Sequence, residues 1–239
     1  MTVSEFSAEF DVLFNNITSN QAPGLNDYEK SVFLTNAEYA LVNEYFNPVT
    51  DNTNGGFDRT PRRQDDFSTL IETTVVNSAV PAVKYDPRSI PFEMPARAWI
   101  ILNEEVISLD DNGTQYTVVP ISYKEYKRLM SKPYKLPLKG QIWRLITNMQ
   151  QNMPLIELIG KFPTAGYVYK MRYVKKPAPI ILEDLSQYQV SIDGQTNAAT
   201  CELPEEMHRE VLERAVTLAK IAWMGGTMTQ YAVNASKEK

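Results

Sequence analysis

The sequence predicts an α+β protein with helices at the N-terminus, a central and mainly antiparallel β region, and an amphipathic C-terminal helix. Apolar residues recur at helical spacing near the start, and short runs of β-branched and aromatic residues fill the middle. A helical pattern then returns after Pro204. We therefore divide the chain into residues 1–66, 67–200 and 201–239, which we expect to form one compact domain with arms.

The N-terminal region is expected to hold several short helices. The first should begin behind Ser4, because apolar side chains follow it at spacings of one, three or four: Phe6, Phe10, Leu13, Phe14 and Ile17. Asn26 with Glu29, and Thr35 with Glu38, each have the spacing of a capping box. We therefore expect two short helices here rather than one long one.

A long loop is expected over residues 47–66, which lack apolar periodicity and contain a Gly-Gly pair and two prolines. Arg59, Arg62 and Arg63 lie in this loop, with Phe57 as a candidate anchor. One interpretation is a docking arm whose charges set the orientation of a partner chain. The alternative is a solvated loop without a role.

The central region contains the signals of a β-sheet. A hairpin is expected where Asp110-Asp111-Asn112-Gly113 separates two strand-like runs, 97–109 and 114–120. Ser122 with Glu125 predicts a capped helix after the hairpin. The remaining strand candidates are residues 140–147, 155–159 and 167–174.

The candidate strand at 167–174 has one aromatic and one mostly basic face, because its residues alternate between these types. Arg172, Lys175 and Lys176 are candidate contacts with another chain. Two prolines then stop the strand, so residues 177–182 should continue as an extended segment. This segment is a second candidate arm.

The last helix has the clearest boundaries. Pro204 suits the first helical position, acidic residues follow it, and Gly225-Gly226 can end the helix. A tail with few apolar residues follows. The face expected to be buried consists of Met207, Val211, Ala215, Leu218 and Ala222.

Composition indicates a globular protein and makes several functions improbable. With 239 residues, 43% hydrophobic and 22% charged, the chain can bury a sizeable core. The net charge is −5 and the 24 Lys and Arg are scattered along the sequence, which argues against nucleic acid as the main ligand. A single cysteine suits a reducing compartment. We expect neither a secretion signal nor a membrane span.

The residues that most often carry catalysis are sparse. His208 is the only histidine, and we expect it at the surface beside an acid. Cys201 is expected to be a small buried side chain, and one Cys with one His cannot supply a zinc site. The acidic pairs Glu104-Glu105, Asp110-Asp111 and Asp65-Asp66 suit opposite strand faces or turns better than a joint site. We therefore expect no enzyme activity, no cofactor and no metal.

Three segments together resemble virion neck proteins of crAss-like bacteriophages. They are FDVLFNNITSNQAPGLNDYEKSVFLTNAEYALVNEYFNP (10–48), GFD…RRQDDFSTLI (56–71) and MRYVKKPAPIIL (171–182). The resemblance implies a structural ring subunit between the portal and the tail, in twelve copies and without a cofactor. The implied partners are further copies of itself, the portal, and other neck or tail proteins.

The resemblance also implies a location in the virion neck, assembly in the cytoplasm of the bacterial host, and at most passive contact with DNA in the channel. Three alternatives stay open. The first is a different tail or baseplate component, the second is a small carboxylate-dependent enzyme, and the third is a nucleic-acid-binding module. The long loop, the Pro-stopped segment and the tail are candidate arms for assembly.

Overall fold

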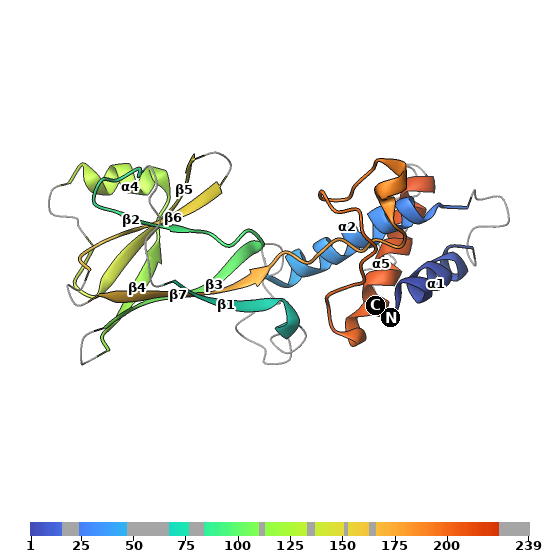
Figure 1. Cartoon of the computed structure of the whole chain (residues 1–239), viewed down its shortest axis with the longest axis horizontal. Coiled ribbons are helices and arrows are strands. Elements are labelled where there is room, and N and C mark those ends of the chain that lie inside the picture. Colours follow the sequence, from blue (N-terminus) through green and yellow to red (C-terminus); the bar gives the residue numbers. More distant parts are fainter. Residues whose placement is uncertain are drawn as a thin grey trace. The chain divides into compact units, whose positions relative to one another are not determined.

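A computed structural model shows the α+β architecture (Figure 1). It describes residues 1–15, 24–46, 67–76, 84–109, 113–132, 137–150, 153–162 and 166–224. Within them lie four α-helices and a seven-stranded sheet. The chain divides into a helical unit, Met1–Leu70 with Lys176–Lys239, and a sheet unit, Ile71–Lys175.

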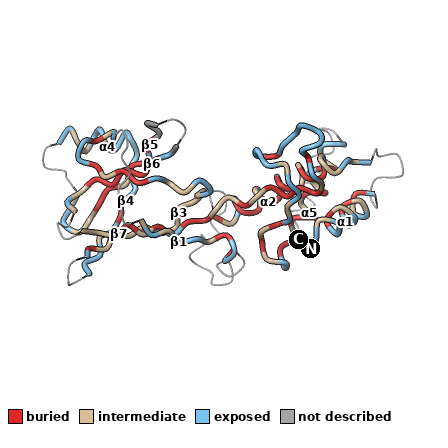
Figure 2. The backbone as a smooth tube through the Cα atoms, viewed as in Figure 1, coloured by how far each residue is buried: buried red, intermediate tan, exposed pale blue. Residues whose placement is uncertain are grey.

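The helical unit is built on α1 (Val3–Asn15), α2 (Asp27–Phe46) and α5 (Glu205–Met224). Their apolar faces bury side chains such as Phe6 and Phe10, and Figure 2 shows the long buried stretches on α2. Thr2, rather than Ser4, forms the N-terminal cap of α1: its hydroxyl accepts from the Glu5 amide, while Glu5 accepts from the Thr2 amide at 2.7 Å. The predicted box of Asn26 and Glu29 at the start of α2 is confirmed.

The prediction of two short helices is wrong, because α2 is one helix of 20 residues. Thr35 and Glu38, expected to cap a second helix, lie inside α2 and are buried. With Ser31 they form a polar stripe at spacings of four and three, on one side of the helix. Hydroxyls and carboxylates on such a stripe can form hydrogen bonds with a neighbouring segment of the chain. The sequence spacing of such residues is the same as that of a helix cap, so spacing alone does not tell the two roles apart.

The segment after β7 uses this stripe. The amide of Ile180 donates to Thr35 Oγ1 at 3.1 Å, and the amide of Leu182 donates to Ser31 Oγ at 2.9 Å. Ile181 forms a two-way backbone bridge with Ala199. Residues 180–182 are buried, so the interpretation of this segment as a free arm is wrong. Strand β7 ends at Lys175, before the two prolines, as predicted. The short helix η3 (Leu185–Tyr188) follows.

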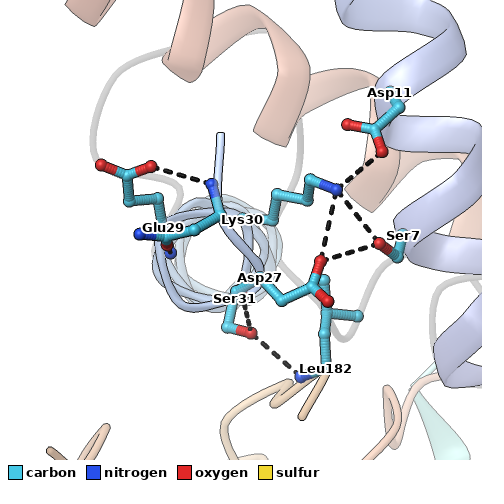
Figure 3. Close-up of polar contacts among 8 residues, drawn as sticks. Ser7, Asp11, Asp27, Glu29, Lys30, Ser31 and Leu182 are labelled. Carbon is cyan, nitrogen blue, oxygen red and sulfur yellow. Dashed lines mark hydrogen bonds and ion pairs between the residues drawn. The ribbon is translucent and has the colours of Figure 1, made fainter. Parts of the chain in front are cut away.

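The ion-pair cluster around Lys30 ties α1 to α2 (Figure 3). The Lys30 ammonium lies 2.7 Å from Asp11 and 3.2 Å from Asp27, and it donates to Ser7 Oγ at 3.1 Å. Lys30 itself is buried. Its charge is therefore compensated by two carboxylates, as a buried cation requires.

Helix α5 buries a face slightly different from the predicted one. Met207, Val211 and Ala215 are buried as expected, but Leu218 is 37% exposed and Ala222 is exposed, so the prediction is wrong for these two. Additional buried positions on α5 are His208, Leu212, Val216 and Ala219. The apolar stripe thus continues beyond the part of α5 that the core covers. Gly225 and Gly226 lie outside the described residues.

The sheet unit contains seven strands in the order β1-β7-β3-β4-β5-β6-β2. The strands are β1 (Ile71–Val76), β2 (Ile90–Glu93), β3 (Ala98–Ser108), β4 (Gln115–Pro120), β5 (Gln141–Gln150), β6 (Met153–Ile159) and β7 (Tyr167–Lys175). All neighbours are antiparallel except β4 and β5. The predicted hairpin is β3 paired with β4, while its turn residues 110–112 lie outside the described part.

The sheet is strongly curled. β7 and β2 are five positions apart in the strand order, which in a flat sheet means about 24 Å at the usual strand spacing. The ring centroids of Phe92 on β2 and Tyr169 on β7 are nevertheless only 5.2 Å apart. The inner face therefore closes on itself around one apolar cluster: Phe92, Val106, Val118, Ile142, Ile156, Leu158, Tyr169, Met171 and Tyr173.

Helix α4 (Tyr123–Met130) covers part of the outer face as the crossover between β4 and β5. Its predicted capping box of Ser122 and Glu125 is confirmed. Tyr126, Leu129 and Met130 pack towards a cluster that includes Trp143 of β5. The helix is thus anchored by its inward face.

A buried carboxylate fixes the loop beside α4. Glu157 on β6 accepts hydrogen bonds from the amide of Tyr85 at 2.8 Å and the hydroxyl of Ser89 at 2.6 Å. Asp86 in the same loop accepts from the Tyr126 hydroxyl of α4 at 2.9 Å. The loop and α4 therefore have a fixed position on the sheet.

Candidate assembly surfaces

His208 is not the surface histidine that we expected. It is buried on α5, its Nδ1 lies 2.7 Å from the amino group of Met1, and its Nε2 lies 2.8 Å from the carbonyl of Leu203. With Nδ1 accepting from the amino group, Nε2 carries the proton and donates to the carbonyl. Burial lowers the pKa of His208, and the positive amino group lowers it further. Both ring nitrogens are thus engaged in structural contacts.

Cys201 is buried, as predicted, and its Sγ donates to Glu38 Oε1 at 3.2 Å. Burial raises the pKa of the thiol, and the adjacent Glu38 carboxylate raises it further. A reactive cysteine needs a lowered pKa, because the thiolate is the nucleophile. The environment of Cys201 therefore favours a structural role over a nucleophilic one.

The acidic pair Glu104-Glu105 on β3 is divided between the two faces of the sheet, in keeping with strand geometry. Glu104 forms a buried ion pair with Arg144, 2.9 Å from its Nε, and accepts from the Tyr169 hydroxyl. Burial raises the pKa of Glu104. Glu105 pairs with Lys170 at 3.1 Å. Among the described residues, no three His, Cys, Asp or Glu side chains are grouped to hold a metal.

Of the residues that we predicted to contact another chain, only Arg172, Lys175 and Lys176 lie in the described part. Phe57, Arg59, Arg62 and Arg63 lie outside the described residues, as do Asp65-Asp66 and Asp110-Asp111. Arg172 is exposed on β7. Lys175 lies 3.4 Å from Glu72, and Lys176 lies 2.6 Å from Asp193 and 4.5 Å from the ring centroid of Tyr39. The two lysines therefore already have partners within the chain.

Charge is divided unequally between the two units, which sequence inspection missed. The sheet unit holds 14 of the 24 Lys and Arg but only nine of the 29 Asp and Glu, a net charge of +5. The helical unit holds the other ten and twenty, a net charge of −10. The basic residues, although scattered along the sequence, are thus unequally divided between the units.

The most concentrated positive charge lies on α4. Lys124, Lys127 and Arg128 follow one another at spacings of three and one, and Lys132 follows directly after the helix. All four side chains are exposed, and none forms an ion pair with another described residue. We call these four residues the α4 basic surface. Tyr123, 40% exposed, lies at the start of the same helix.

These features indicate contact surfaces. The candidate nucleophile and base are buried in structural contacts, while charged and amphipathic side chains are presented outward on a firmly anchored helix. No helix in the described part is long and apolar enough to cross a bilayer. Such a combination is typical of a structural subunit that binds other protein subunits.

Comparison with known proteins identifies the family. The model of the family described as phage tail ring protein 3/4 matches residues 1–230. The chain is 47% identical over 229 residues to ring protein 4/5 of Bacteroides phage crAss001, covering 94% of both chains. It is 33% identical over 228 residues to ring protein 3 of the same phage, covering 93% of this chain and 96% of that protein.

The chain belongs to the phage tail ring protein 3/4 family. It is a structural ring protein of a crAss-like phage virion and assembles with other virion proteins. The resemblance seen in the three sequence segments is thereby confirmed.

Proposed function

We propose that this chain forms a closed ring in the neck of the virion, between the portal and the tail, where the ring surrounds the path of the DNA. The near full-length match to two ring proteins of one phage carries this proposal. Two related ring proteins in one virion are what a stack of similar rings requires. A neck ring matches the symmetry of the portal, so we propose twelve copies, assembled in the host cytoplasm.

We propose that the protein acts by contact alone, without catalysis. The environments of Cys201 and His208 support this, since the first is a protonated thiol beside a carboxylate and the second has both nitrogens engaged. The candidate contact residues are Phe57, Arg59, Arg62, Arg63, the exposed Arg172, and Lys175 and Lys176, which also pair with Glu72 and Asp193 within the chain.

A stop codon introduced into the gene tests the position in the virion. The expected result is DNA-filled or emptying heads without attached tails, because a missing neck ring interrupts the joint between the two. The measurement is electron microscopy of particles from the infected host, with the wild-type gene supplied from a plasmid as the control. Tails attached to heads but incomplete at their far end would instead assign the protein to the tail tip or baseplate.

A further inference from the structure

The position of the α4 basic surface is fixed before any partner binds. The inward side chains of α4 pack on the sheet, and its first turn is held by the capping box of Ser122 and Glu125. The Tyr126 hydroxyl bonds Asp86, whose loop is in turn held by Glu157. The cations therefore stand on a preorganised support, which reduces the entropy that binding costs.

The charges on α4 oppose one another. Lys124 lies one helical turn from both Lys127 and Arg128, and like charges at these spacings destabilise a helix. Lys124 also lies in the first turn, where the helix dipole disfavours a cation. The single acid of the helix, Glu125, is committed to the cap, because its carboxylate accepts from the amide and the hydroxyl of Ser122 at 3.0 Å each. Lys127 and Arg128 lie in the last turn, where the helix dipole favours cations, so the unfavourable charge is that of Lys124. An external anionic partner would offset the repulsion at this position.

The helical unit offers the opposite charge. Every described Lys and Arg of this unit already has an ion-pair or hydrogen-bond partner within the chain: Lys30, Lys176, Arg209, Arg214 and Lys220. Carboxylates are in excess, and Glu9, Glu205 and Glu206 are exposed without an ion pair to another described residue. Within its own unit, each of these exposed charges has no ion pair with another described residue.

We propose that the α4 basic surface docks on the acidic helical unit of the next copy of this chain, and that this contact closes the ring. The inference rests on the proposed ring function. A ring contact is heterologous, so each copy must present two different and complementary faces. The basic α4 surface and the acidic helical unit supply these two faces, one of each per copy. Complementary charges of this kind set the orientation in which two copies bind and the rate at which they meet.

DNA is the other polyanion that such a surface fits. A second copy of this chain is the favoured partner for two reasons. Each copy carries both the basic surface and the carboxylates that match it, and the exposed Tyr123 on the same helix suits a contact with protein.

Two charge-reversal variants of the full chain test the contact. The first carries Lys124→Glu, Lys127→Glu and Arg128→Glu, and the second carries Glu9→Lys, Glu205→Lys and Glu206→Lys. Each alone should assemble at least about tenfold more weakly than wild type, since like charges then face each other across the ring. An equimolar mixture should recover ring assembly, because alternating copies restore opposite charges at every contact. Native mass spectrometry at several salt concentrations measures the assembly.

Lys84→Glu with Lys139→Glu and Lys161→Glu provides the control for net charge, since it also reverses three charges and all three lysines are exposed in the sheet unit outside α4. Thermal unfolding of each variant separates lost assembly from lost folding. Normal rings from the first variant, or no recovery in the mixture of two folded variants, overturn the proposal. Wild-type assembly with loss of duplex DNA binding in the first variant assigns α4 to DNA instead. A wild-type chain that stays monomeric at every concentration contradicts the proposed ring itself.

Discussion

Replacement of Leu212 with alanine is expected to lower the free energy of unfolding by about 2–5 kcal/mol. Leu212 is fully buried on α5, on the face that packs in the core of the helical unit with α1 and α2. Truncation removes apolar contacts and leaves a cavity that the surrounding helices fill only in part. Urea denaturation, followed by circular dichroism of the helices, measures the change.

Leu218→Ala on the same helix is the matched control. The substitution is chemically identical, but Leu218 is 37% exposed, so less buried surface is lost and the cost should be under about 1 kcal/mol. An equal loss of unfolding free energy in the two variants would mean that Leu218 is packed as tightly as Leu212, contrary to the structure.

Replacement of Glu104 with leucine is expected to destabilise the sheet unit by about 3–5 kcal/mol. Glu104 and Arg144 form an ion pair whose side chains are almost fully buried on the inner face of the curled sheet. Without the carboxylate, Arg144 keeps its charge, because a guanidinium does not lose its proton in proteins. The Tyr169 hydroxyl also loses its acceptor. Tryptophan fluorescence during denaturation, in a Trp223→Phe background, reports on this unit, because the remaining Trp99 and Trp143 both lie in it.

Two further variants show whether the loss comes from the uncompensated charge. Glu105→Leu, one position along β3, removes a partner of the more exposed Lys170 and should cost about 1 kcal/mol or less. Glu104→Leu combined with Arg144→Leu removes both charges and should recover much of the loss. A double variant less stable than Glu104→Leu alone would show that shape, rather than charge, decides the effect.

Local signals predicted the parts of the fold that depend on few neighbours. The capping boxes at Asn26 and Ser122 and the hairpin of β3 and β4 were predicted because their geometry is set by residues close in sequence. Thr35 and Glu38 have the same spacing as a cap, but their partners are Ile180 and Cys201. Only the packing of distant segments on α2 decides between the two roles.

The candidate site depended still more on the tertiary structure. The helical unit combines both ends of the chain, so its charge excess is invisible in a linear reading. Burial of His208 requires α1 beside α5, an arrangement that the pattern of either helix leaves open. The α4 cations are close in sequence and the cap that engages Glu125 was predicted, but the exposure of these cations and their lack of an ion pair with another described residue come from the structure.

Electron cryo-microscopy of the virion neck tests the central claim most directly. We expect twelve copies of this chain in one closed ring between the portal and the tail, with α4 of each copy against the helical unit of the next. Density for this chain only at the far end of the tail, or as isolated copies without a closed ring, would contradict the account.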